Sequence, residues 1–169
     1  MAAPHPSAPE ITLELPDEAA TAALARRLAG LARAGDVIAL SGDLGTGKTA
    51  FARAFINALP RPAGAEGGEE PEEVPSPTFT LLQIYERAPA PVWHFDLYRL
   101  ERPEEVYELG LEEALQLAIS LIEWPERLGP LLPAERLDLL LEYAASPGAR
   151  RARLSAMDAW ARRLETLHD

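Results

Sequence analysis

The chain has 169 residues, of which 47% are hydrophobic and 25% are charged, and these values are typical of a single soluble globular domain. Its formal net charge of −11 would repel nucleic acid, and without cysteine it can form neither a disulfide nor a thiolate metal site. We therefore expect no direct binding of RNA or DNA. Because the sequence shows no signal-peptide pattern and no apolar run of about 18 residues, we also expect a cytoplasmic protein with no membrane segment.

The N-terminal part of the chain predicts an arm, a strand and a helix. Residues 1–9 are rich in proline and alanine, which indicates a loose arm before a single domain of residues 10–169. Residues 11–15 alternate apolar and polar side chains, as a short strand does. The segment Pro16-Asp17-Glu18 has the chemistry of a helix start, and we expect this helix to end near Gly35. Its predicted inner face carries Leu24, Leu28 and Leu31.

A predicted buried strand and a second helix flank a glycine-rich segment. Residues 37–40 form a short apolar run that contains β-branched side chains, which is typical of a buried strand. A helix is expected after Lys48, and Pro60 and Pro62 end it because proline cannot continue a helix. One face of this helix carries Phe51, Ala54, Phe55 and Ala58.

The segment that follows has a different composition. Residues 61–75 are rich in proline, glycine and glutamate, and such a composition cannot bury apolar surface. We therefore expect a flexible acidic loop. Its carboxylates could bind a cation, but a solvated acidic run is the favoured interpretation.

The second half of the chain begins with a predicted β-hairpin. Residues 81–85 and 92–97 have strand patterns on either side of a proline-rich turn. A helical region begins at Pro103, and residues 118–122 form an apolar strand that leads into Glu123. The expected core contacts of the helical region are Leu109, Leu111, Leu115 and Leu117.

The C-terminal part predicts a second hairpin and a closing helix. Residues 137–143 alternate as a strand, and residues 151–155 can pair back on them. The closing helix carries Trp160, Leu164 and Leu167. Taken together, the order of elements predicts a three-layer α/β domain with a mixed, mainly parallel sheet and an antiparallel C-terminal hairpin.

The glycine-rich segment fits the pattern of a phosphate-binding loop. Gly42-Asp43-Leu44-Gly45-Thr46-Gly47-Lys48-Thr49 has the spacing Gly, any four residues, Gly-Lys-Thr, and Lys48 is the only lysine among 16 cationic residues. The glycines can take positive φ and let backbone N–H groups converge on an anion at the start of the next helix. A compact ammonium can follow phosphate oxygens, whereas the planar fork of arginine has stricter geometry. Thr49 would place its hydroxyl on Mg²⁺. The segment therefore predicts a P-loop NTPase-like fold that binds a nucleotide.

Two strand-end carboxylates are candidates for the metal site. Asp96 ends an apolar strand, as the metal-binding aspartate of such a site does, although a turn aspartate remains an alternative. Glu123 occupies a similar position, and a solvent-facing role is its alternative. We expect His94 to face the side opposite Asp96 and to be a structural histidine. Because His5 and His168 are far away in the sequence, no histidine metal cluster is expected.

Four motifs in this order resemble the TsaE family, the bacterial ATPase component of the machinery that makes threonylcarbamoyladenosine (t6A) in tRNA. The motifs are the phosphate-binding loop at 42–49, Ser76-Pro77-Thr78-Phe79-Thr80, His94-Phe95-Asp96-Leu97-Tyr98-Arg99-Leu100 and Ile122-Glu123-Trp124-Pro125. The resemblance covers residues 11–167. The chain departs from the family pattern in its acidic insertion near residues 63–73 and in its proline-rich arm, and neither departure touches a motif.

The resemblance implies an ATPase that binds ATP or ADP with Mg²⁺, is slow alone, and works with TsaB and TsaD. Contact with tRNA would be indirect, through that complex, and ATP hydrolysis would reset the assembly. The implied catalytic residues are Lys48, Thr49, Asp96 and Glu123, and the implied metal contacts are Thr49, Asp96 and Glu123. The implied nucleotide contacts are Glu18, Gly42, Asp43, Leu44, Gly45, Thr46, Gly47, Lys48, Thr49, Ala50, Thr78 and Trp124.

Two of these assignments have structural alternatives. Thr78 could sense the γ-phosphate as part of a switch segment, or lie in a turn that leads into a strand. Trp124 could pack on the nucleotide or a partner, or fill a gap in the core.

A phosphate-binding loop also occurs in proteins that are not ATPases. A small-molecule kinase needs an acceptor pocket and basic lid residues, for which Arg61, Arg150, Arg151 and Arg153 are candidates. A GTPase is disfavoured because the only asparagine, Asn57, lies in a predicted helix and no guanine-recognition motif is present. A nucleotide-gated binding module with negligible turnover is the third alternative.

Overall fold

The computed structural model describes residues 9–65 and 70–168. All but the last residue of the expected N-terminal arm, and part of the acidic loop, therefore lie outside the described residues. Within the described chain, the strands are β1 (Glu10–Leu15), β2 (Val37–Ser41), β3 (Leu82–Tyr85), β4 (Val92–Asp96), β5 (Ile119–Glu123), β6 (Leu137–Tyr143) and β7 (Arg150–Ala156). The α-helices are α1 (Glu18–Ala29), α2 (Lys48–Ala58), α3 (Leu111–Leu117) and α4 (Asp158–Leu164). Short 3₁₀ helices are η1 (Pro103–Tyr107), η2 (Pro125–Leu131) and η3 (Glu165–His168).

These strands form one sheet in the order β1-β7-β6-β2-β5-β4-β3. Strands β6, β2, β5 and β4 at its centre are parallel, while β3 and β7 run against their neighbours. Since β1 is antiparallel to β7, it shares the direction of the central strands. The predicted mixed, mainly parallel sheet and the antiparallel C-terminal hairpin are both confirmed. The carboxyl ends of the central strands meet at one edge of the sheet, where ligands of open α/β sheets bind.

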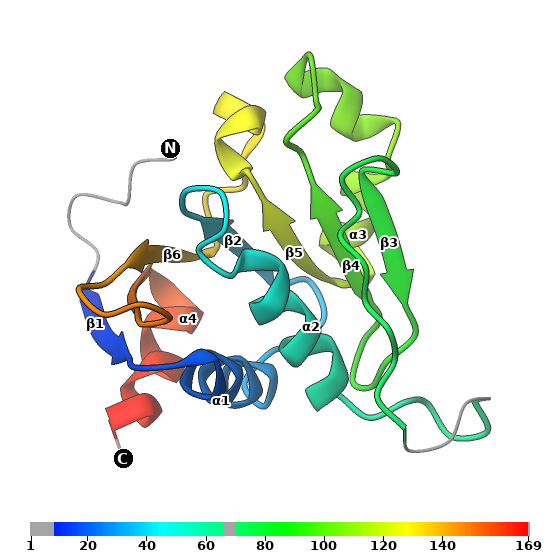
Figure 1. Cartoon of the computed structure of the whole chain (residues 1–169). Helices are drawn as coiled ribbons and strands as arrows, with labels where there is room; N and C mark the ends of the chain where they lie inside the picture. Colours follow the sequence, from blue (N-terminus) through cyan, green and yellow to red (C-terminus); the bar gives the residue numbers. More distant parts are fainter. Residues whose placement is uncertain (1–8, 66–69, 169) are drawn as a thin grey trace.

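Helices cover both faces of the sheet, which confirms the predicted three-layer architecture (Figure 1). Helices α1 and α2 cover one face, and the fully buried Leu28, Phe51 and Phe55 pack there. Helix α3 and the η1 and η2 segments cover the other face, where Phe95 and Leu111 are buried. Full burial of side chains of this size stabilises the fold by about 1.5–3 kcal/mol each.

The alternation of strand side chains decides which residues reach the helix α2. In β4, Val92 belongs to the core under α1 and α2, whereas Trp93 and Phe95 belong to the core under α3. In β5, Leu121 and Ile122 divide between the two cores in the same way. Because side chains alternate with a period of two, positions 94, 96 and 123 face the α2 side.

The first helix is shorter than expected. Asp17 caps α1 by accepting a hydrogen bond from Ala20 N at 2.8 Å, and the helix ends at Ala29 with Gly30 as its C-cap. The prediction of an end near Gly35 was wrong because Arg33 N donates to Asp36 Oδ2 at 2.6 Å, which forms a separate turn. Among the expected core residues of the later helices, Leu117 is 41% exposed. It is the last residue of the short helix α3, whose buried residues are Leu111 and Ala114.

The described part of the predicted acidic loop contains no helix or strand, and its end packs on α2. Asn57 donates from Nδ2 to Glu72 O at 3.0 Å and accepts from Glu72 N at 2.8 Å. Val74 is buried, and Arg87 donates to the Glu72 carboxylate at 2.8 Å. Residues 72–74 are therefore attached to the domain just before the Ser76–Thr80 motif.

No helix in the described segments has the length and apolar character needed to cross a membrane.

Candidate nucleotide-binding site

The glycine-rich segment connects the end of β2 to the start of α2 and takes a conformation that requires glycine. Gly42, Gly45 and Gly47 have φ values of +140°, +84° and +104°. A Cβ atom on Gly42 would lie 2.4 Å from the carbonyl oxygen of Leu141, and one on Gly45 would lie 2.7 Å from the hydroxyl of Tyr143. The predicted strand, loop and helix, with positive φ at all three glycines, are confirmed.

Side chains of the C-terminal hairpin hold the carbonyl groups of this loop. Tyr143 donates from its hydroxyl to Leu44 O at 2.6 Å, and Arg150 donates to Thr46 O at 3.1 Å and to Gly45 O at 3.3 Å. The C=O and N–H of a trans peptide point in opposite directions. The N–H groups of Gly45 and Gly47 are therefore directed away from the hairpin.

Lys48 is buried and its ammonium lies over the loop. Its Nζ donates to Gly42 O at 2.7 Å and to Asp43 O at 2.9 Å, and it lies 4.4 Å from the ring centre of Trp124. Burial lowers the pKa of Lys48, and the nearby carboxylates, Glu123 first among them, oppose that shift. The one lysine of the chain is thus held among carbonyl oxygens and an aromatic face at the start of α2.

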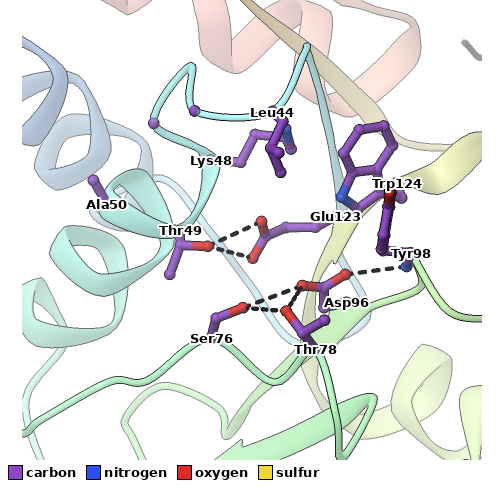
Figure 2. A pocket seen from close by; sticks show the side chains of 12 residues that line it. Leu44, Lys48, Thr49, Ala50, Ser76, Thr78, Asp96, Tyr98, Glu123 and Trp124 are labelled. Atoms are coloured by element: carbon purple, nitrogen blue, oxygen red, sulfur yellow. Dashed lines mark hydrogen bonds between the residues drawn. The ribbon is translucent and has the colours of Figure 1, made fainter.

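Two buried carboxylates face Lys48 and Thr49 from adjacent strands. Asp96 and Glu123 are register partners at the carboxyl ends of β4 and β5, and each is 3% exposed. Thr49 donates from its hydroxyl to the Glu123 carboxylate, with distances of 3.1 and 3.2 Å to its two oxygens (Figure 2). The structure therefore brings Thr49, Asp96 and Glu123 together, as predicted, and the solvent-facing alternative for Glu123 is wrong.

Asp96 also accepts hydrogen bonds from two hydroxyl groups of the Ser76–Thr80 motif. Its Oδ2 accepts from Thr78 at 2.9 Å and from Ser76 at 3.2 Å, and its Oδ1 accepts from Tyr98 N at 3.1 Å (Figure 2). The bond from Tyr98 N is typical of an aspartate that stabilises a turn, so the turn interpretation of Asp96 is also correct. The same side chain faces the site. Thr78 lies in a turn before β3, and its hydroxyl still reaches the candidate metal residue.

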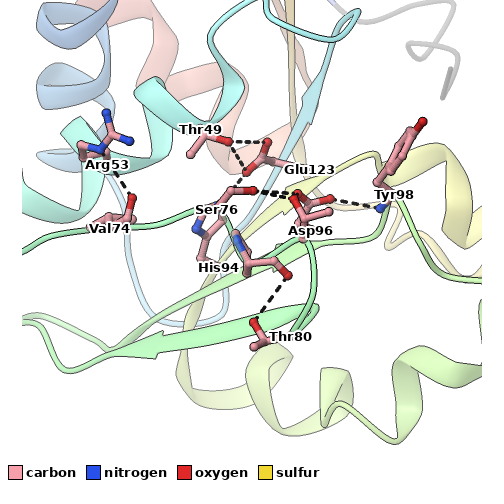
Figure 3. A network of polar contacts seen from close by, with 11 residues as sticks. Thr49, Arg53, Val74, Ser76, Thr80, His94, Asp96, Tyr98 and Glu123 are labelled. Atoms are coloured by element: carbon pink, nitrogen blue, oxygen red, sulfur yellow. Dashed lines mark hydrogen bonds and ion pairs between the residues drawn. The ribbon is translucent and has the colours of Figure 1, made fainter.

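The prediction that His94 faces the side opposite Asp96 was wrong. Residues two apart in a strand point to the same face, so His94 and Asp96 lie on the same side of β4. His94 is fully buried, and its Nε2 lies 2.6 Å from Glu123 Oε2 (Figure 3). His94 therefore belongs to the polar network of the site.

The residues at the loop line two cavities. We call the first the carboxylate cavity, which has a volume of about 310 Å³. It is lined by Leu44, Gly45, Gly47, Lys48, Thr49, Ala50, Ser76, Thr78, Asp96, Tyr98, Glu123 and Trp124. We call the second the hairpin cavity, which has a volume of about 340 Å³. It is lined by Pro16, Asp17, Glu18, Thr21, Gly45, Thr46, Gly47, Ala50, Pro147, Gly148 and Arg150.

Most of the residues expected in the site line one of these cavities. Glu18 and Thr46 line the hairpin cavity, so Glu18 does not join the carboxylates. Gly42 and Asp43 line neither cavity and instead offer their carbonyl oxygens to Lys48. Trp124 lines the carboxylate cavity and also packs against the core under α3, so its core interpretation is confirmed, while packing on a nucleotide or a partner stays a prediction. Its φ of +58° is unusual for a large residue and places its ring 5.0 Å from that of Tyr98.

Sequence reasoning missed several residues of the site. Tyr98 and Ser76 belong to the predicted motifs but were not predicted as site residues. The available signal was the position of Tyr98 two residues after Asp96 and of Ser76 two residues before Thr78. Tyr143 was predicted only as part of the alternating strand 137–143, but it is 54% exposed and binds the loop. For Arg150 the sequence offered only its membership of an arginine cluster.

Comparison with known proteins places the chain in a family. The model of the family described as "Threonylcarbamoyl adenosine biosynthesis protein TsaE" matches residues 15–152. The tRNA threonylcarbamoyladenosine biosynthesis protein TsaE of Rickettsia felis is 43% identical over 130 residues, which are 77% of this chain and 71% of the relative. TsaE of a Nostoc species is 38% identical over 146 residues, which are 83% of each protein.

A solved structure agrees with this assignment. The crystal structure of YdiB from Bacillus subtilis matches with a TM-score of 0.77 at 28% identity, and the match covers 97% of both chains. The chain therefore belongs to the TsaE family of tRNA threonylcarbamoyladenosine biosynthesis proteins.

Proposed function

We propose that this protein is the ATP-binding, Mg²⁺-dependent ATPase of the machinery that makes t6A in tRNA. The observation that carries the proposal is that two cavities meet at Gly45, Gly47 and Ala50 of one phosphate-binding loop. A nucleoside in the hairpin cavity would extend its phosphates across the loop into the carboxylate cavity. Membership of the TsaE family supports the same assignment.

The loop supplies the interactions that a triphosphate requires. The amides of Gly45 and Gly47 and the positive end of α2 favour an anion, and Lys48 adds a mobile positive charge. Lys48 now binds Gly42 O and Asp43 O, which are neutral acceptors. A phosphate oxygen is a stronger acceptor for an ammonium than a backbone carbonyl is. We therefore expect the ammonium of Lys48 to leave the two carbonyl groups and bind the phosphates when ATP binds.

The oxygen donors of the carboxylate cavity fit Mg²⁺. Thr49, Asp96 and Glu123 would hold it or its water ligands, because Mg²⁺ prefers oxygen ligands and commonly uses one or two carboxylates together with phosphates. No cluster of three or more histidine and carboxylate ligands occurs among residues 9–65 and 70–168. When bound, the cation would neutralise charge on the phosphates.

The roles of the chain's own residues follow from these positions. Lys48 would neutralise charge that develops on the transferred phosphoryl group, and Glu123 would orient the attacking water. Ser76 and Thr78 would link the segment 76–80 to the metal residue Asp96, so that this segment reports the state of the nucleotide. Glu18 and Thr21, which line the hairpin cavity, would contact the nucleoside.

The partners we propose are TsaB and TsaD, with tRNA bound only through them. The net charge of −11 supports a protein that acts on other proteins and leaves RNA to them. ATP hydrolysis would reset the assembly between cycles. A cytoplasmic location stays a prediction.

No observation favours the small-molecule kinase. Lys48 is the only cationic side chain that lines the carboxylate cavity among the described residues. The other candidate lid cations are engaged elsewhere: Arg150 binds the loop, and Arg151 and Arg153 pair with Glu14 and Glu142.

The proposal is tested by steady-state phosphate release from ATP, measured for the protein alone and with TsaB and TsaD. We expect slow release alone, a strong dependence on Mg²⁺, and acceleration by the partners. ATP binding without any release under either condition would identify a nucleotide-gated binding module instead. Direct, salt-sensitive binding of tRNA by the isolated chain would contradict the indirect contact with RNA.

A further inference from the structure

We propose that His94 is a positioning residue that fixes the carboxylate of Glu123 from inside the sheet. This inference rests on the proposed function, since the orientation of Glu123 matters for catalysis only if the site hydrolyses a nucleotide. The contact itself can be tested without that function.

Glu123 is held from two sides by two different elements. His94, on β4, is fully buried and lies 2.6 Å from Glu123 Oε2. Thr49, at the start of α2, shares one hydroxyl proton between the two carboxylate oxygens at 3.1 and 3.2 Å. The histidine contact is the shorter one, and it comes from a strand that has a neighbouring strand on each side (Figure 3). His94 therefore constrains Glu123 even when the hydroxyl of Thr49 turns toward a cation.

The register of the sheet explains why His94 reaches Glu123. His94 pairs with Leu121 and Asp96 pairs with Glu123 across the parallel strands β4 and β5. His94 and Glu123 are thus diagonal neighbours on one face, a separation that long side chains can span. Asp96 is the direct register partner of Glu123, but its carboxylate accepts hydrogen bonds from Ser76, Thr78 and the backbone of Tyr98 instead.

The chemistry of the pair assigns the direction of the hydrogen bond. We assign the proton of this contact to Nε2 of His94, because the carboxylate of Glu123 already accepts from Thr49 and an imidazole N–H is the donor that suits a carboxylate oxygen. Nδ1 of His94 is buried and has no hydrogen-bond partner within the described part of the structure. The ring is therefore assigned as the Nε2–H tautomer, which directs its one N–H at Glu123.

Two amide substitutions separate positioning from mere packing. The side-chain nitrogen of glutamine can occupy about the place of Nε2, whereas that of asparagine lies near Nδ1. His94→Gln can thus donate to Glu123, and His94→Asn cannot. Both variants lose the ring and bury an amide, so each is a control for the other.

We expect His94→Asn to lower kcat about 10- to 100-fold, the usual effect of removing the group that orients a metal-site ligand. His94→Gln should restore most of that loss, and KM for ATP should change little in either variant. The dependence of ATP affinity on Mg²⁺, measured by calorimetry, should weaken in His94→Asn and not in His94→Gln. This second readout does not require turnover.

A double-mutant cycle with Glu123→Gln tests whether His94 acts through Glu123. In that background, His94→Asn should cause little further loss of kcat, because residues that act as one unit are not additive. Full additivity, or equal losses in His94→Asn and His94→Gln, would show that His94 only fills space. Wild-type kcat in a folded His94→Asn variant would also overturn the proposal.

If both variants fail to fold, ¹⁵N NMR of the wild-type imidazole decides. We expect His94 to show a protonated Nε2, an unprotonated Nδ1 and slow exchange of the Nε2 proton. An unprotonated Nε2 would overturn the inference. If the wild-type protein neither binds nor hydrolyses ATP, the proposed function fails, while the NMR result still judges the contact between His94 and Glu123.

Discussion

Replacing Arg150 with methionine should weaken ATP binding although the residue lies outside every sequence motif of the site. The guanidinium of Arg150 donates to Thr46 O at 3.1 Å and Gly45 O at 3.3 Å and lies 4.8 Å from the ring centre of Tyr143. Methionine keeps most of the apolar stem and removes both hydrogen bonds. The phosphate-binding loop would then sample other conformations, and ATP would have to order it on binding.

The size of the effect follows from the two lost contacts. A hydrogen bond to a charged group contributes about 1.5–3 kcal/mol, and the length and partial exposure of these two bonds place their combined contribution at about 1.5–3 kcal/mol. Since about 1.4 kcal/mol corresponds to tenfold in affinity, the Kd for ATP should rise about 10- to 150-fold. The upper value applies if all of the lost energy appears in binding.

Calorimetric titration with ATP and Mg²⁺ measures this effect, and the chain provides a matched control. Arg153 lies on the same strand, pairs with Glu142 at 3.1 Å and is 43% exposed, so Arg153→Met makes the same change in net charge away from the loop. Tyr143→Phe removes only the hydrogen bond to Leu44 O and should have a smaller effect in the same direction. If Arg150→Met binds ATP as tightly as Arg153→Met, the hairpin does not organise the loop.

Three further substitutions test the other parts of the site. Lys48→Ala should reduce turnover by about 30- to 1,000-fold, since one preorganised charge contact contributes about 2–4 kcal/mol to transition-state stabilisation. Undiminished ATPase activity in a folded variant would contradict this prediction. Asp96→Asn should weaken the Mg²⁺ dependence of ATP hydrolysis, and an unchanged Mg²⁺ titration would leave Asp96 with only its turn role. Glu123→Ala should retain ATP while hydrolysing it more slowly, as single-turnover assays would show, and a loss of binding alone would reassign Glu123 to the nucleotide contacts.

Local patterns in the sequence were enough to predict the phosphate-binding loop and the fold around it. The positive φ of Gly42, Gly45 and Gly47 is a local property of the loop, and the apolar run before them marks the strand. The clashes that a side chain on Gly42 or Gly45 would make, with Leu141 and Tyr143, could not be predicted in this way. Asp96 and Glu123 could be placed together because parallel strands bring their carboxyl ends to one edge of a sheet.

The support of the loop could not be predicted because it depends on strand order. Tyr143 and Leu44 are 99 positions apart, and Arg150 and Thr46 are 104 positions apart. They meet because β6 lies beside β2 in the sheet, a neighbour that periodicity does not reveal. His94 is a different case, because alternation puts it on the same face as Asp96 although the prediction placed it on the opposite face, and its contact with Glu123 depends on the register of β4 against β5.

The central claim is that backbone amides and one ammonium hold the phosphates of an adenine nucleotide. Calorimetry of the wild-type protein with ATP, ADP and adenosine, each with Mg²⁺, tests it most directly. The phosphate-binding loop predicts clear affinity for ATP and ADP, little for adenosine, and a loss of the preference for phosphate in Lys48→Ala. Equal affinity for all three ligands, or no heat of binding with folded protein, would contradict it.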